Sequence, residues 1–144
     1  MGVAIMSDDV KKIIYLIDDD DMQLTTSELF LQDEYEIYKS KSGQEALDYI
    51  NSNELIPDLV LLDILMPDMD GWEVFRKMKE MDLLKKVPIV FLTSVEAEVE
   101  RKRAYNIGIT DYIVKPYNMT ELKSRVKNII KNQQPRPEGR GMWF

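Results

Sequence analysis

Side chains able to do chemistry stand where several short apolar runs of this chain end. They are Asp18 and Asp19 after residues 13–17, Asp63 after 59–62, Thr93 after 89–92 and Lys115 after 112–114. Together they supply three carboxylates, one hydroxyl and one ammonium group. Carboxylates held close together repel one another, and some protonate unless a cation sits among them. Mg²⁺ fits such a set because it binds a few carboxylates and keeps waters that a phosphate can displace.

These groups also suit phosphoryl transfer. A metal ion, a lysine and a hydroxyl can together contact the three equatorial oxygens of a transferring phosphoryl group. A carboxylate can itself be the nucleophile and form an aspartyl phosphate. The chain contains no His, so a phosphohistidine donor must come from another protein. It contains no Cys either, which excludes disulfides and thiol chemistry.

The apolar runs and the segments between them predict an α/β fold. Continuous runs at 13–17, 59–62 and 89–92 are typical of strands buried on both faces of a parallel sheet. The alternating segment at 34–38 and the short run at 112–114 are predicted edge strands. In a parallel sheet the carboxyl ends of the strands lie along one edge, where open α/β sheets bind ligands. The polar groups named above are therefore expected in one crevice.

Helices are predicted between the strands. Three begin with capping pairs, in which a polar residue accepts a backbone N–H and an acidic residue follows three positions later: Ser42 and Glu45, Asp70 and Glu73, Asn118 and Glu121. The last helix carries an apolar stripe of Leu122, Val126, Ile129 and Ile130. The helix over 96–106 is rich in charge and poor in apolar anchors, so we expect it to be weakly buried. We expect Ser94 to cap it.

Length, charge and composition limit the domain organisation and the possible partners of the chain. A length of 144 residues suits one domain, which we place at 12–132. We expect residues 1–11 to be disordered or derived from cloning, and the Pro/Gly-containing end at 133–144 to be a flexible tail, a linker or a remnant. A net charge of −7 argues against direct nucleic-acid binding by this domain. No apolar run is long enough to span a bilayer and no secretory leader is evident, so a cytoplasmic location without membrane contact is expected.

Four segments in this order resemble the receiver domains of two-component response regulators. They are Ile17 to Asp20, Asp58 to Gly71, Phe91 to Ser94 and Asp111 to Pro116, and the resemblance covers about residues 12–131. It implies a flavodoxin-like, doubly wound five-stranded parallel sheet of order 2-1-3-4-5 with five flanking helices. It also implies a protein that catalyses only its own phosphorylation and dephosphorylation and is not otherwise an enzyme. The phosphoryl donor would be a sensor histidine kinase or a His-containing phosphotransfer protein.

The resemblance assigns roles to individual residues. Asp63 would be the phosphoacceptor, with Thr93 and Lys115 contacting the phosphoryl group. Mg²⁺ would be held by Asp19, Asp63 and the backbone carbonyl of Leu65, with Asp18 acting mainly through water. Thr93 and Tyr112 would form the switch, in which the aromatic ring moves inward as the hydroxyl moves. The Lys115–Pro116 peptide bond is expected to be cis.

Three positions depart from the family's more usual residues or stand out among its variants. Leu65 and Val95 occupy the positions two past Asp63 and Thr93, which flank the phosphoryl group in this family. Because apolar side chains cannot orient an attacking water, we predict slow spontaneous dephosphorylation. Ile109 stands where the family more often has Ala, which leaves the packing of the helix before it uncertain.

The predicted output surface is formed by the helix over 96–106, the strand at 112–114 and the last helix. Asp111, Arg125, Arg101 and Arg103 on this surface partly resemble the charged set by which one group of transcription factors dimerises, so a homodimer through it is a hypothesis.

Alternatives remain open at this stage. Residues 18–21 taken alone are more typical of a solvated acidic turn that caps a helix, and Tyr112 taken alone is more typical of a core residue. Two alternatives are a stand-alone receiver and the receiver fragment of a longer regulator with a further, DNA-binding output domain. A third alternative is a magnesium-dependent phosphohydrolase of similar topology, which the lack of a second acidic residue for general acid catalysis disfavours.

Overall fold

The structure is a computed structural model and describes residues 10–133 of the 144-residue chain. In chain order the elements are β1 (Lys12–Ile17), α2 (Asp21–Leu31), β2 (Tyr35–Ser40), α3 (Gly43–Asn53), β3 (Leu59–Asp63), α4 (Gly71–Glu80), the short 3₁₀ helix η2 (Asp82–Leu84), β4 (Ile89–Thr93), α5 (Glu98–Asn106), β5 (Asp111–Val114) and α6 (Met119–Lys131). Strands and helices alternate along the chain, as the apolar runs predict.

The five strands form one parallel sheet in the order β2-β1-β3-β4-β5. The predicted flavodoxin-like order is therefore confirmed. Strand order reverses between β1 and β3, because the chain first adds β2 on one side and then β3, β4 and β5 on the other. Crevices at such a reversal are where open α/β sheets bind ligands.

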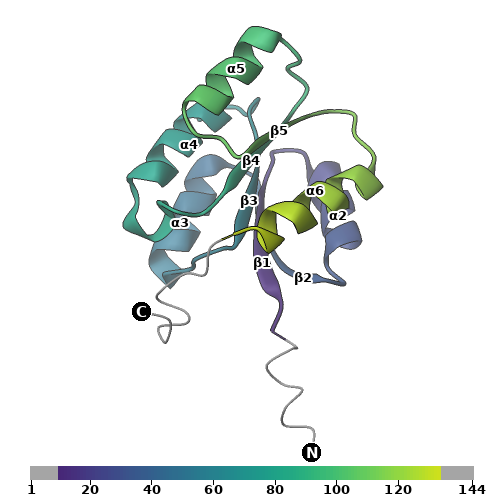
Figure 1. The fold of residues 1–144 in the computed structure, drawn as a ribbon. Coiled ribbons are helices and arrows are strands. Elements are labelled where there is room, and N and C mark those ends of the chain that lie inside the picture. Colours follow the sequence, from purple (N-terminus) through teal and green to yellow (C-terminus); the bar gives the residue numbers. More distant parts are fainter. Residues whose placement is uncertain (1–9, 134–144) are drawn as a thin grey trace, which may run out of the picture.

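Helices cover both faces of the sheet. Figure 1 shows α3, α4 and α5 on one face and α2 and α6 on the other. Each face has its own apolar core: one is built around Val60, Leu62 and Phe91, and the other around Leu61, Val90 and Leu92. Strands β3 and β4 are buried along their whole length, which explains why their sequences are continuously apolar rather than alternating.

The predicted capping pairs are confirmed at three helices. The side chains of Ser42, Asp70 and Asn118 each accept a hydrogen bond from the backbone N–H of the acidic residue three positions later, at 3.1, 3.0 and 2.6 Å. Such a cap satisfies one of the N–H groups that the first helical turn leaves without an intrahelical partner.

Helix α5 differs from the prediction at its start. Ser94 does not cap it, because the helix begins at Glu98 and the N-cap position is Ala97, which makes no side-chain hydrogen bond. Ser94 lies three positions before this N-cap, too far for its hydroxyl to serve as the cap. The expectation of weak burial is confirmed, since Ala104 is the one buried residue of α5. Ile109, the bulky residue that follows this helix, is buried in the core on the same face of the sheet.

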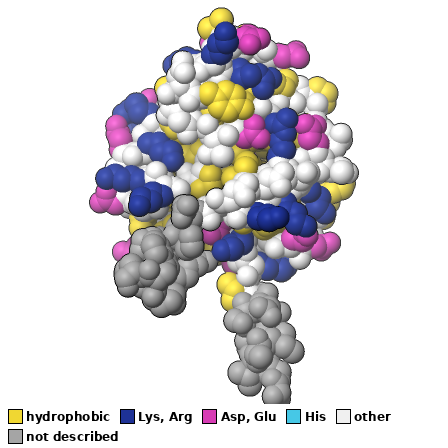
Figure 2. Space-filling view, viewed as in Figure 1, with side chains coloured by type: hydrophobic (Ala, Val, Ile, Leu, Met, Phe, Trp, Pro, Cys, Tyr) yellow, Lys and Arg dark blue, Asp and Glu magenta, His cyan; other side chains and the backbone are white. Residues whose placement is uncertain are grey.

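The surface carries charges of both signs. On the face shown in Figure 2, basic and acidic side chains are interspersed rather than gathered into single-sign patches. Between residues 10 and 133 no helix has the length and apolar character that crossing a bilayer requires. The expectations about the chain ends concern mainly residues 1–9 and 134–144, which lie outside the described residues.

Candidate functional site: an acidic cluster at the carboxyl edge of the sheet

The sheet brings the predicted site residues to one edge. Asp18 and Asp19 directly follow β1, Asp63 is the last residue of β3, Thr93 is the last residue of β4 and Lys115 directly follows β5. Neighbouring strands are in register here: Asp63 pairs with Leu92, and Thr93 pairs with Val114. Alignment of the strand ends therefore collects functional groups from four strands.

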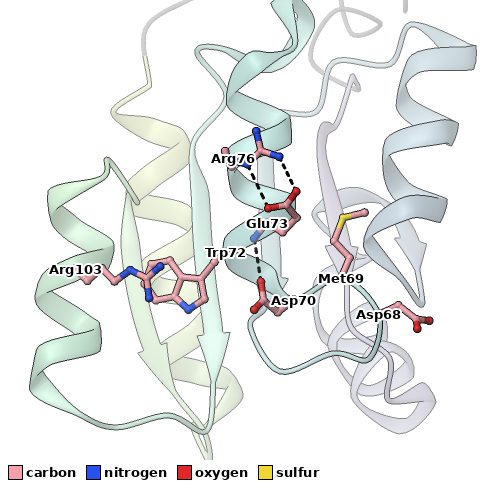
Figure 3. Close-up of a pocket in the computed structure, with 7 residues that line it drawn as sticks. All are labelled: Asp68, Met69, Asp70, Trp72, Glu73, Arg76 and Arg103. Carbon is pink, nitrogen blue, oxygen red and sulfur yellow. Dashed lines mark hydrogen bonds and ion pairs between the residues drawn. The ribbon is translucent and has the colours of Figure 1, made fainter.

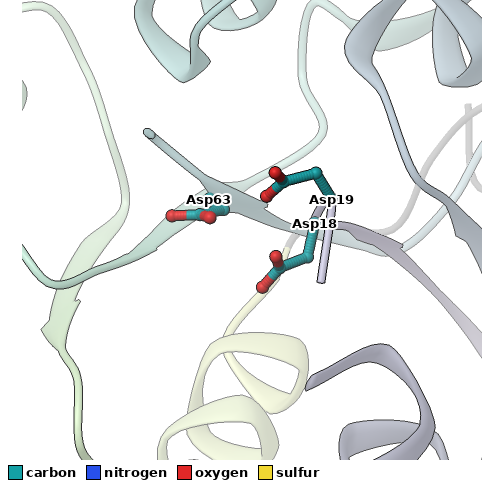
Figure 4. A group of neighbouring side chains, drawn as sticks. All are labelled: Asp18, Asp19 and Asp63. Atoms are coloured by element: carbon teal, nitrogen blue, oxygen red, sulfur yellow. The ribbon is translucent and has the colours of Figure 1, made fainter. Parts of the chain in front are cut away.

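Three carboxylates form the centre of the site. Asp18, Asp19 and Asp63 each offer an oxygen within 4.8 Å of the others, and Figure 4 shows their carboxylates pointing to the same side. Asp18 and Asp63 are buried, while Asp19 is exposed to solvent. A buried pair and an exposed third carboxylate leave the cluster open from one direction. Oxygen ligands in this arrangement fit a hard divalent cation.

Burial and neighbouring charges raise the pKa of Asp63 to about 6, from an ordinary value of 3.8. Removal from water is the largest cause, and the negative charges of Asp18 and Asp19 act in the same direction. The ammonium of Lys115 and a hydrogen bond from the backbone N–H of Leu65, at 3.4 Å, oppose the increase. Repulsion within the cluster is thus only partly neutralised by protein groups, and a bound cation would complete the neutralisation.

Lys115 bridges two of the carboxylates. Its Nζ lies 3.0 Å from Asp18 Oδ2 and 3.7 Å from Asp63 Oδ2. Burial by itself lowers the pKa of Lys115, but the hydrogen bond to Asp18 and the charges of Asp18 and Asp63 outweigh it, and the net change is an increase. The ammonium is therefore charged. Its backbone N–H donates to Thr93 O at 2.7 Å, and the Lys115–Pro116 peptide bond is cis, as expected.

The acidic run after β1 has two separate roles. Asp20 is the N-cap of α2, and its side chain accepts hydrogen bonds from the backbone N–H groups of Met22 and Gln23. Asp18 Oδ1 accepts the Asp20 N–H at 3.0 Å, which fixes the turn that carries the cluster. The cap interpretation of this run is therefore correct for Asp20, while Asp18 and Asp19 belong to the acidic cluster.

Thr93 and Tyr112 are linked through one residue. Thr93 is fully buried, and its Oγ1 accepts the N–H of Val95 at 3.1 Å. The hydroxyl of Tyr112 donates to the carbonyl of the same Val95 at 2.7 Å. The ring of Tyr112 is 1% exposed, so it lies in an inward orientation. These contacts join the two predicted switch residues to the segment that leads into α5.

Gly71 has a structural role that the sequence motifs do not predict. A Cβ atom at this position would lie 2.6 Å from the carbonyl oxygen of Asp63 and 2.7 Å from the Cα of Ile64. The N–H of Gly71 donates to Ile64 O at 2.8 Å and closes the loop after β3. The absence of a side chain therefore lets α4 begin directly against the strand end that carries Asp63. The sequence signal that could have indicated this role is the position of the glycine directly after Asp70, the residue that caps α4.

The two predicted flanking positions differ in their exposure to solvent. Leu65 is 55% exposed beside the cluster, and Val95 is partly buried on the side of β4. Neither side chain has a group that can hydrogen-bond to water.

Known proteins resemble this chain in sequence. A family model described as the response regulator receiver domain matches residues 14–127. Curated relatives include the transcriptional regulatory protein CrdR of Helicobacter pylori, 31% identical over 124 residues, and SrrA of Staphylococcus aureus, 34% identical over 122 residues. These matches cover 85% and 84% of this chain but 57% and 48% of the relatives. The chain therefore spans about half the length of these relatives.

Solved structures show the same architecture. A putative response regulator from Chloroflexus aurantiacus is similar with a TM-score of 0.77 and 33% identity, over 85% of this chain and 100% of that one. The Mn²⁺-bound form of response regulator Rcp1 is similar with a TM-score of 0.70 and 26% identity, over 84% and 93% of the two chains.

Proposed function

Because this chain belongs to the response regulator receiver domain family, we propose that it is a switch controlled by phosphorylation of Asp63. The single observation that carries the proposal is the convergence of Asp18, Asp19, Asp63 and Lys115 at the reversal point of the sheet. Asp63 ends a buried strand in this cluster, so its carboxylate has a fixed position and an open approach.

The proposed cofactor is Mg²⁺, held by Asp19, Asp63 and the backbone carbonyl of Leu65, with Asp18 acting through water. The fit rests on the three clustered oxygens, and on the burial and neighbouring negative charges that raise the pKa of Asp63 and make its anionic form unfavourable without a counter-charge. The similar response regulator Rcp1 has been solved in an Mn²⁺-bound form, which supports the binding of a divalent ion by this fold. When bound, the ion supplies positive charge that lets an anionic donor approach the carboxylates.

The chain's own residues then have defined tasks. A carboxylate oxygen of Asp63 forms the new bond to phosphorus as the bond from phosphorus to the donor's leaving group breaks. Lys115 moves its ammonium from the Asp18 carboxylate toward the phosphoryl oxygens, and Thr93 offers its hydroxyl as a hydrogen-bond donor. Each interaction strengthens as negative charge gathers at Asp63.

The natural donor is proposed to be a sensor histidine kinase or a His-containing phosphotransfer protein. The chain has no His of its own. Met22, in the first turn of α2 beside the acidic cluster, is 75% exposed, and Leu29 lies on the same side of this helix and is 60% exposed. Two exposed apolar side chains seven residues apart give α2 a surface on which a partner helix can pack.

The response is proposed to pass to the surface formed by α5, β5 and α6, since the segments after Thr93 and Lys115 lead into these helices. The relatives are transcriptional regulators about twice as long as the matched region. The second candidate is therefore the receiver part of a longer regulator with an output domain that binds DNA. In both cases we propose a cytoplasmic protein whose only catalysis is its own phosphorylation and dephosphorylation.

The test is phosphorylation by a small acyl phosphate, measured by intact mass. Wild type should gain one phosphoryl group with Mg²⁺ and none without it, and Asp63→Asn should gain none. Asp68→Asn is the matched control: Asp68 is an exposed carboxylate of the same loop, outside the cluster, with a φ of 69° that Asn tolerates. Its adduct should equal that of wild type. An unmodified wild type, or an adduct that survives in Asp63→Asn, would refute the proposal.

A further inference from the structure

Helix α5 has an unusual means of attachment to the rest of the molecule. Ala104 is its one buried residue, and its N-terminus has no side-chain cap. A nine-residue helix with so little apolar burial is not stable by itself. Other contacts must therefore hold α5 in place.

Two arginines of α5 supply such contacts by covering aromatic rings on other elements. The guanidinium of Arg103 lies 4.0 Å from the ring centroid of Trp72 on α4, across the indole as Figure 3 shows. The guanidinium of Arg101 lies 5.1 Å from the ring centroid of Tyr112 on β5, and its Nη1 donates to Tyr112 O at 3.3 Å. Both are cation–π contacts of the kind that arginine favours.

The two covered rings meet at a third. Phe91, buried in β4, contacts Trp72 edge to face at a centroid distance of 5.0 Å and contacts Tyr112 in the same manner at 6.2 Å. A continuous series of contacts thus starts at Arg103, passes through the three rings and returns to α5 at Arg101. We call these five residues the arginine–aromatic clamp.

The clamp includes the proposed switch residue. Tyr112 is held inward by protein groups alone: Phe91 beside its ring, Arg101 over its face and the Val95 carbonyl at its hydroxyl. Val95 belongs to the segment between Thr93 and α5, so a shift of α5 and a rotation of Tyr112 disturb the same contacts.

The Arg103 end of the clamp borders open space at the surface. A surface pocket of about 370 Å³ lies beside Trp72 and is lined by Asp68, Met69, Asp70, Glu73 and Arg76 as well as the two stacked residues (Figure 3). The other ionic contact of Arg103, 3.7 Å to Glu100, lies within α5 and does not attach the helix to anything else.

We propose that Arg101 and Arg103 are positioning residues that hold α5 docked and Tyr112 inward, and so favour phosphorylation of Asp63. The final clause rests on the function proposed above, whereas the coupling of α5 to Tyr112 does not. If phosphorylation favours the inward ring, linkage requires that the inward ring favours phosphorylation to the same extent. Each arginine contributes roughly a two- to fivefold bias, the range expected for an exposed cation–π contact.

The experiment compares Arg101→Gln, Arg103→Gln and the double variant with Lys102→Gln. Lys102 is an exposed cation between the two arginines, so the control removes the same charge from the same helix. Protein labelled with 3-fluorotyrosine is observed by ¹⁹F NMR, with the Tyr112 signal assigned by Tyr112→Phe. Acyl phosphate phosphorylation rates are measured on the same samples.

We expect the ratio of solvent-exposed to inward Tyr112 to rise about two- to fivefold in each single variant and further in the double variant, and phosphorylation to fall in proportion to the inward population that is lost. Arg103→Lys keeps the charge but loses the planar stack and should restore only part of the effect. Tyr112 spectra of all arginine variants identical to Lys102→Gln would overturn the proposal. If wild type takes no phosphoryl group, the function proposed above fails, but the ¹⁹F spectra still decide whether the clamp exists.

Discussion

Helices α5 and α6 flank the same edge strand, yet they are attached to the sheet in different ways. The segment after Thr93 leads into α5, and the segment that carries Lys115 leads into α6. Helix α6 buries Leu122 and Val126, and Ile129 and Ile130 pack against the same core. Helix α5 buries Ala104 and otherwise relies on its arginines.

This difference divides the site into a fixed half and an adjustable half. Full burial of a Leu or Val side chain contributes about 1.5–3 kcal/mol, whereas an exposed cation–π contact contributes about 0.5–1 kcal/mol. Lys115, Asp18 and Asp63 therefore rest on elements that are costly to move. Thr93 is joined to a helix that can shift at little cost. A switch needs both, because a fixed group must receive the charge and a movable one must respond to it.

The largest predicted effect concerns stability. Leu122→Ala should lower the free energy of unfolding by about 3 kcal/mol, because it opens a cavity under α6. Val99→Ala on α5 should change it by less than about 0.5 kcal/mol, because Val99 is 73% exposed. Urea denaturation of both variants measures the contrast. Equal losses in the two helices would remove the basis of the comparison.

The second prediction concerns the cost of holding the Asp63 charge in its buried position near other carboxylates. The pKa of Asp63 is about 6 in the folded state against 3.8 ordinarily, so folding favours its protonated form. The stability cost is absent below pH 4, appears as pH rises from about 4 to 6, and is complete above pH 6. Without Mg²⁺, Asp63→Asn should therefore be up to about 3 kcal/mol more stable than wild type at pH 8.

Denaturation of both proteins in EDTA across this pH range tests the sign. The advantage of Asp63→Asn should vanish toward pH 4, and Asp68→Asn should show no such trend. An advantage independent of pH would mean that the ionisation of Asp63 is not its cause.

The third prediction concerns loss of the phosphoryl group. Wild type should dephosphorylate slowly, because Leu65 and Val95 cannot orient water. Leu65→Gln should accelerate the loss about tenfold, or about 1.4 kcal/mol in activation free energy, because its amide can orient a water near Asp63. Val95→Gln should give a smaller gain, since its segment shifts with α5. Decay of the phosphorylated mass provides the rates, and Leu65→Ile is the apolar control. Rapid loss from wild type would contradict this prediction.

The smallest predicted effect concerns the association of two copies of the chain through the surface formed by α5, β5 and α6. Within the chain, Asp111 accepts hydrogen bonds from Arg125 at 3.3 Å and from the hydroxyl of Tyr105 at 3.1 Å. Exposed pairs of this kind contribute up to about 1 kcal/mol, so Asp111→Ala with Arg125→Ala should weaken any phosphorylation-dependent dimer about fivefold. Sedimentation equilibrium of the phosphorylated proteins measures it, with Lys127→Ala on α6 as control. A dimer of unchanged affinity in the double variant would exclude these residues from the interface.

The sequence predicts the features that depend on local pattern. Asp63 and Thr93 could be placed together because parallel strands end at one edge, and the caps at Ser42, Asp70 and Asn118 depend on residues three positions apart. The prediction that Ser94 caps α5 was wrong. Ala97, the actual N-cap, has no side-chain group that could mark it as a cap in the sequence, whereas Ser94 has a hydroxyl. The stacking of Arg103 on Trp72 and the approach of Gly71 to Asp63 join residues on different elements, so only the three-dimensional packing reveals them.

The position of Trp72 gives this protein an intrinsic optical reporter. An indole changes its emission when a nearby charge moves, and here a guanidinium lies 4.0 Å from the ring. The sequence contains one other tryptophan, Trp143, which Trp143→Phe would remove. Emission from the remaining indole would then follow the motion of α5 in real time, without any attached dye.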